Sequence, residues 1–278
     1  MLCFAGYVGA KNKPKGIRSE VFAYKKRVRI ISVVTFVIIF SLIIVVSYYL
    51  LGYFAGPKST IEETEGNPSD NSLRVTLIDA LFSSYPNEEF TRSVNKTLRQ
   101  AGFEVDIYQG KEVTVDFLKR LTGGYKVVIL RMHSALSTSN ELYLFTAEPY
   151  SVGKYAQEQY FRLVKEAYPT EESQSVFAVN WGFIKSLMTG KFNGTLVIVM
   201  GCDGAVDPCM TQEFINQGAI GYVAWNGPVL LSHSDEAILY LIQALYMEGL
   251  PLGEAVEKTD SQIGEDPNWG AVLDYYVP

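Results

Sequence analysis

A histidine and a cysteine follow two of the most hydrophobic segments of this chain, and together they are its strongest chemical signal. Residues 126–132 (Lys-Val-Val-Ile-Leu-Arg-Met) run into His133, and residues 195–201 (Thr-Leu-Val-Ile-Val-Met-Gly) run into Cys202. Such aliphatic runs are typical of strands buried on both faces of a parallel sheet. Catalytic groups in these sheets gather just beyond the carboxyl ends of the strands. We therefore expect Cys202 to be a nucleophile and His133 its general base, within hydrogen-bonding distance or one water apart.

Strand and helix patterns alternate along the part of the chain that must position these two residues. Expected strands cover residues 74–79, 103–108, 126–133, 195–202 and 219–225, with a short strand or hairpin arm at 141–146. Expected helices cover residues 88–101, 114–121, 154–167, 181–188, 208–217, 233–247 and 252–261. This alternation predicts an α/β fold, a three-layer α/β/α sandwich with a mostly parallel sheet.

The motifs around the two residues resemble those of the caspase-like cysteine peptidases, a group that includes caspases, gingipains and CHAT-type peptidases. In that group an α/β domain carries His at the end of its third strand, usually before Gly. It carries Cys at the end of its fourth strand, in motifs such as Ala-Cys-x-Gly. Here residues 132–134 read Met-His-Ser, and residues 201–204 read Gly-Cys-Asp-Gly. The helix and Gly-Ala strand at 208–225 are also similar to the gingipain and CHAT pattern. The resemblance implies a cysteine peptidase with Cys202 as nucleophile and His133 as base.

Residues next to the expected pair are candidates for supporting roles. Backbone groups at Ser134, Gly201 and Asp203 could stabilise the oxyanion of an acyl intermediate. Gly201 would also let a substrate backbone approach closely.

Four residues are candidates for a substrate pocket. They are Asp79, Asp203, Asp207 and Trp225. Asp203 and Asp207 beside the nucleophile could favour a basic side chain in the substrate. Both residues are equally well interpreted as turn and helix-cap residues.

A different interpretation of the cysteine leads to a different function. A cysteine at a strand end is often only a small buried hydrophobe. Cys202 could also form a disulfide with Cys209 in an oxidising exterior. We expect instead a free thiol, whose pKa would be lowered in a working nucleophile. In addition, Ser134 replaces the glycine that is common in the resembled group. The alternative function is therefore a catalytically inactive caspase-like domain, acting as an extracytoplasmic binding or sensor module.

A second strong feature lies near the N-terminus, where residues 30–54 carry no charged side chain. About 20 apolar residues cross a bilayer as a helix, so this segment is long enough to span one. A cleaved signal peptide is the alternative, but its apolar core is usually only about 7–15 residues long. We therefore expect one transmembrane helix at 30–54, in contact with membrane lipid.

The distribution of charge gives this segment an orientation. Of the chain's 24 basic and 30 acidic residues, residues 1–29 hold eight and one. The positive-inside rule places this basic segment in the cytoplasm. Residues 55–72 are polar, acidic and rich in turn formers, which is typical of a flexible stalk. The sequence thus predicts a single-pass membrane protein whose α/β domain, residues 73–278, is extracytoplasmic.

The composition argues against several other classes of function. The part of the chain beyond the hydrophobic segment is acidic, which disfavours nucleic-acid binding because phosphate contacts need clustered Lys and Arg. The two histidines are isolated and no Cys-x-x-Cys spacing occurs, so no metal site is expected. No Gly-x-Gly-x-x-Gly or phosphate-loop pattern points to a nucleotide cofactor. The expected partner is a peptide or protein, as substrate or ligand.

Overall fold

The computed structural model describes residues 39–46, 73–121, 123–188 and 190–278. The chain divides into two units, Met1–Glu65 and Gly66–Pro278. In the first unit residues 39–46 are helical. The rest of the predicted span at 30–54, like the predicted basic segment and stalk, lies outside the described residues. Within those described ranges, no helix has the length and hydrophobicity that crossing a membrane requires.

The second unit is built on a six-stranded sheet with the strand order β10-β9-β8-β3-β1-β2. Its strands are β1 (Arg74–Asp79), β2 (Glu104–Gln109), β3 (Val127–Arg131), β8 (Leu196–Val199), β9 (Gly221–Trp225) and β10 (Leu273–Tyr276). The first five are parallel, and β10 pairs with β9 in the antiparallel direction. The predicted α/β fold with a mostly parallel sheet is confirmed.

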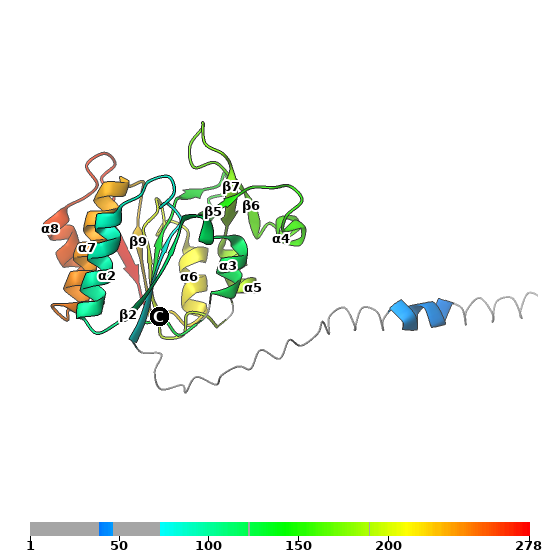
Figure 1. The fold of residues 1–278 in the computed structure, drawn as a ribbon, viewed down its shortest axis with the longest axis horizontal. Helices are drawn as coiled ribbons and strands as arrows, with labels where there is room; N and C mark the ends of the chain where they lie inside the picture. The colour runs from blue at the N-terminus through cyan, green and yellow to red at the C-terminus, as the bar shows by residue number, and fades with distance from the viewer. Residues whose placement is uncertain (1–38, 47–72, 122, 189) are drawn as a thin grey trace, which may run out of the picture. The chain divides into compact units, whose positions relative to one another are not determined.

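Helices cover both faces of this main sheet (Figure 1). One face packs against α2 (Glu88–Gln100), α7 (Leu231–Tyr246) and α8 (Leu252–Ile263). The other packs against α3 (Val115–Arg120), α5 (Trp181–Leu187) and α6 (Pro208–Asn216). Alternate residues of each central strand enter the two cores, so every residue of β3 and β8 is buried. This explains why both strands are continuous hydrophobic runs in the sequence.

A second, antiparallel sheet is inserted between β3 and β8. Its order is β4-β5-β7-β6. The strands are β4 (Ser134–Leu136), β5 (Leu142–Pro149), β6 (Val164–Ala167) and β7 (Val176–Val179), with the short helix α4 (Ala156–Tyr160) beside them (Figure 1). The 3-10 helix η2 (Gly110–Glu112) follows β2 and contacts β5.

Several local predictions were wrong. The expected helix at 154–167 is the short helix α4 followed by strand β6, because pairing with β7 outweighs the helix propensity of Lys, Glu and Ala. Strands β7 and β10 were not predicted. Both site-bearing strands also end earlier than expected, β3 at Arg131 and β8 at Val199.

Candidate functional site

The fold brings His133 and Cys202 to matching positions at one edge of the main sheet. In chain order, β3 and β8 are the third and fourth strands of this sheet, and they are direct neighbours. Their last paired residues are Leu130 and Val199, so His133 and Cys202 both lie three positions beyond the last pair. The juxtaposition expected from the sequence is therefore present at the level of the backbone.

A direct contact holds the two strand ends together. The Ser134 hydroxyl donates a hydrogen bond of 2.6 Å to the carbonyl of Cys202. Gly201 permits this approach, since a Cβ atom there would lie 2.2 Å from Ser134 Oγ and 2.6 Å from the carbonyl oxygen of Met132. Ser134 and Gly201 thus support the site by packing the chain after β3 against the chain after β8.

The Cys202 thiol is half-buried and free, and the exposed Cys209 is also free. The prediction of a free thiol is confirmed, but the lowered pKa expected of a working nucleophile is not, because the pKa of Cys202 is raised. Cys202 Sγ accepts a hydrogen bond of 3.4 Å from the N–H of Val229 and lies 3.7 Å from the carbonyl oxygen of that residue. Burial raises the pKa of the thiol, and the negative charges of Asp203 and Asp266 raise it further. The resting residue is therefore a neutral thiol at pH 7.

Two aromatic side chains lie close to the His133 ring. Its centroid is 5.7 Å from the ring of Tyr85, in an edge-on arrangement, and 6.3 Å from that of Phe145. Burial lowers the pKa of His133, and the positive charge of Arg131 lowers it further. A neutral imidazole is the protonation state that a general base requires.

The imidazole and the thiol are not hydrogen-bonded to each other. His133 Nε2 is buried and has no partner within the described part of the chain. Cys202 Sγ is instead bonded to the backbone of Val229. A direct hydrogen bond, one of the two arrangements expected from the sequence, is therefore not formed in this structure.

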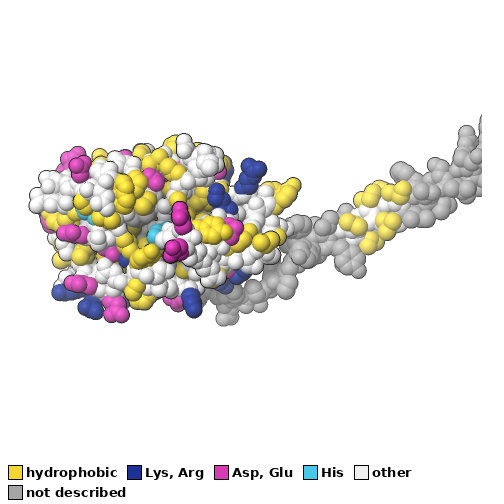
Figure 2. Space-filling model, turned by 90° about the horizontal axis from the view of Figure 1, so that it is seen from above, with side chains coloured by type: hydrophobic (Ala, Val, Ile, Leu, Met, Phe, Trp, Pro, Cys, Tyr) yellow, Lys and Arg dark blue, Asp and Glu magenta, His cyan; other side chains and the backbone are white. Residues whose placement is uncertain are grey.

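A cavity of about 500 Å³ opens beside His133. Its walls come from the segment after β1, from η2, from β5 and from residues 169–176. Tyr85 and Phe145, which flank the His133 ring, both line it, whereas Cys202 does not. Figure 2 looks down on the strand ends and shows histidine side chains among hydrophobic and acidic ones.

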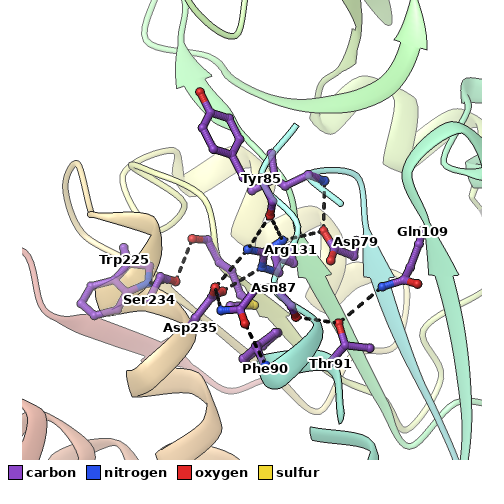
Figure 3. A network of polar contacts seen from close by, with 12 residues as sticks. Asp79, Tyr85, Asn87, Phe90, Thr91, Gln109, Arg131, Trp225, Ser234 and Asp235 are labelled. Carbon is purple, nitrogen blue, oxygen red and sulfur yellow. Dashed lines mark hydrogen bonds and ion pairs between the residues drawn. The ribbon is translucent and has the colours of Figure 1, made fainter. Parts of the chain in front are cut away.

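Two residues before His133, β3 carries a fully buried arginine that organises the surrounding elements (Figure 3). The Arg131 side chain is 1% exposed and forms hydrogen bonds of 2.8 and 3.0 Å to the two carboxylate oxygens of Asp235. It also donates to Asp79 at 2.9 Å and to the carbonyl of Tyr85 at 3.2 Å. Asn87, the N-cap of α2, donates to Asp235 at 2.9 Å. Arg131 thus joins β3, β1, α7 and the loop after β1.

Of the four predicted pocket residues, Asp79 lies inside this network. Its Oδ1 accepts from Arg131 and from the N–H of Leu81, while its buried Oδ2 has no partner among the described residues. Burial raises the pKa of Asp79, and the charge of Arg131 opposes that rise. Asp79 does not line the cavity.

The other three pocket candidates also have local structural roles. Both oxygens of Asp207 are engaged: one caps α6 and the other accepts from the N–H of Leu142 in β5. Trp225 is fully buried, and its indole donates to Ser234 at 2.9 Å. Asp203 has a left-handed backbone with φ of 57°, and its N–H donates to the carbonyl of Gly227. That N–H therefore cannot bind an oxyanion as predicted.

Sequence reasoning missed the roles of Arg131, Asp235 and Tyr85. One signal was available for Arg131, because a single cation in an otherwise apolar buried strand requires compensating carboxylates. Asp235 lies in an expected helix, and no local pattern indicates its contact with Arg131, 104 residues earlier. Tyr85 lies in a loop, where no sequence pattern indicated contact with His133.

We predict that Asp235→Ala lowers the free energy of unfolding by about 3–5 kcal/mol, because it leaves the buried Arg131 charge undercompensated. Chemical denaturation measures this loss. Lys258→Ala is the control, since it breaks the solvent-exposed pair with Glu248 and should change stability by less than about 1 kcal/mol. Equal losses in the two variants would contradict the role assigned to Arg131.

We predict that Gly201→Ala displaces the Ser134 hydroxyl and destabilises the domain by about 1–3 kcal/mol. In the Gly201→Ala/Ser134→Gly double variant the Oγ clash is gone, so part of this loss should be recovered. The clash with the Met132 carbonyl remains, so recovery should be incomplete. Additive effects of the two substitutions in a double-mutant cycle would contradict the contact.

No family model matches this sequence, and no curated protein matches it. Within the described ranges, no cluster of His, Cys, Asp and Glu side chains could hold a metal ion.

Proposed function

We propose that the domain at 73–278 is a caspase-like cysteine peptidase, with Cys202 as nucleophile and His133 as general base. We also propose that the hydrophobic segment at 30–54 anchors it in a membrane as a single-pass protein. The basic N-terminus would then be cytoplasmic and the peptidase domain extracytoplasmic.

One observation carries the enzymatic proposal. His133 and Cys202 occupy matching positions beyond two adjacent parallel strands, and the Ser134–Cys202 hydrogen bond holds those strand ends together. These are the third and fourth strands of the main sheet, as in the group that the motifs resemble. The edge at which the two residues meet is where open α/β sheets carry their chemistry.

The protonation states support a mechanism that begins from a neutral pair. As Cys202 Sγ attacks a peptide carbonyl, the neutral His133 takes the thiol proton, and the new S–C bond gives a tetrahedral intermediate with a negatively charged oxygen. The C–N bond then breaks to leave a thioester, and the protonated His133 gives its proton to the leaving amine. Water hydrolyses the thioester and restores the thiol.

Two backbone N–H groups are candidates for stabilising the oxyanion. Phe145 donates to the carbonyl of His133, so Ser134 and Leu144 form the next, non-hydrogen-bonded pair, in which the Ser134 N–H points away from β5. The other candidate is the N–H of Cys202, which lies close enough to its own sulfur to lower the pKa of the thiol. Both N–H groups belong to residues that the Ser134–Cys202 hydrogen bond holds together.

A second candidate function is supported by the resting state of the thiol. Cys202 has a raised pKa and is bonded to Val229, and His133 Nε2 has no partner among the described residues. These features suit an inactive caspase-like domain that binds a peptide or protein in the cavity beside His133.

We predict that a peptidyl acyloxymethyl ketone labels Cys202 covalently in the full-length protein, because its sulfur displaces the carboxylate leaving group. Labelling should disappear in Cys202→Ala, fall at least about tenfold in His133→Ala, and persist in Cys209→Ala. Mass spectrometry of the labelled peptides gives the readout. Absence of labelling in the reduced wild-type protein would favour the binding module.

We predict that iodoacetamide alkylates Cys202 slowly at pH 7 and about tenfold faster per pH unit as pH rises, because the thiolate is the reactive form. The Cys3→Ala/Cys209→Ala background isolates this thiol. Adding Asp203→Asn should speed alkylation at pH 8, since it removes a negative charge that raises the pKa of Cys202. Asn also tolerates the left-handed backbone at position 203. A rate that is constant between pH 6 and 8 would indicate a preformed thiolate and contradict the neutral pair.

A further inference from the structure

We infer that the cavity beside His133 binds the leaving-group side of the substrate and selects an apolar side chain just after the scissile bond. This inference rests on the proposed peptidase function and names the specificity of that same site. The substrate residue just after the scissile bond is then the main determinant of cleavage. A basic substrate residue beside Asp203 or Asp207 is not.

The position of the cavity relative to the two reactive residues is the first argument. In the sheet, β8 lies on one side of β3 and β1 lies on the other. Cys202 follows β8, whereas the cavity is lined by residues that follow β1, including Ser84 and Tyr85, and by none that follow β8 or β9. His133 therefore lies between the cavity and the nucleophile.

The chemistry of acyl transfer indicates which part of the substrate lies on each side of His133. The acyl part of the substrate becomes bonded to Cys202 Sγ, so it lies on the β8 side. The amine that leaves must receive its proton from His133, so it lies next to the imidazole. A cavity that borders the imidazole and not the thiol is placed to hold the leaving-group side.

The walls of the cavity favour an apolar side chain. Tyr85 and Phe145 contribute aromatic rings close to His133, and Pro149, Pro169 and Val176 extend the apolar lining. A volume of about 500 Å³ lies within the range of pockets that bind small ligands, which are lined mainly by hydrophobic and aromatic groups.

The charged groups of the cavity do not favour a charged side chain. Glu148 is buried, and its carboxylate accepts from Lys154, from the Tyr155 hydroxyl and from the N–H of Val115. It is therefore already compensated and offers little to a cationic substrate. Lys111 is exposed to solvent, where an ion pair with a substrate carboxylate would contribute little.

The full-length protein in detergent should be tested first on denatured proteins, with the new N-termini of the products identified by mass spectrometry. We expect Phe, Leu, Met or Ile to dominate at the first or second position after the cut. Cleavage without this preference, or with apolar selection only before the cut, would overturn the inference and leave the peptidase function intact. Absence of both cleavage and probe labelling would instead refute the peptidase function, and the inference with it.

A charge introduced into the cavity gives a sharper test. A peptide with a preferred cut site should be compared with versions that carry Gly or Lys after the cut. We expect kcat/KM for the apolar version to exceed that for Gly about tenfold or more. Ser84→Asp, at the exposed rim of the cavity, should shift this preference toward Lys, and Ser84→Trp should reduce it by filling the cavity.

The matched control is Ser261→Trp, an exposed position on α8 that does not line the cavity. It should leave the ratio of apolar to Gly cleavage unchanged, and thermal melts should show that all three variants fold. Unchanged ratios in both Ser84 variants would overturn the inference, because side chains of that size and charge cannot enter an occupied pocket without effect.

Discussion

The buried guanidinium of Arg131 is the interaction on which the rest of this domain depends. It joins β3 to Asp79, 52 residues earlier, and to Asp235, 104 residues later. A side-chain charge buried this completely is tolerated only when carboxylates of opposite charge lie beside it. Two residues further along, the chain leaves the main sheet at His133. The compensation of one charge therefore fixes both the strand that presents the imidazole and the loop of Tyr85 that flanks it.

The same charge influences the chemistry that the site can perform. Arg131 and burial together lower the pKa of His133, while burial and two carboxylates raise that of Cys202. Both residues are thus held in their uncharged forms in a partly desolvated environment. In the proposed mechanism such a pair becomes charged only when a substrate is attacked, so the preorganised dipoles around it would be most useful in the transition state.

The sequence predicted the main sheet well because its signals are local. The hydrophobic runs before His133 and Cys202 strongly favour buried strands. The matching positions of the two residues follow from the pairing of these neighbouring parallel strands. The small antiparallel sheet was largely missed, since residues such as Lys165 and Glu166 favour a helix until β7 pairs with them. The cavity could not be predicted because Tyr85 meets His133 from a loop that is distant in sequence, and Phe145 meets it through a pairing of β4 with β5 that was not expected.

The small sheet also affects the order in which the two halves of the site form during folding. Ser134 and Cys202 are 68 residues apart, and the chain between them forms four strands and two helices of its own. Bringing β8 beside β3 closes that long loop, which costs entropy before any contact compensates it. The local hairpin strands can pair earlier, so Phe145 should reach His133 before Cys202 does. Newly made chains would then complete the proposed site only after this long loop has closed.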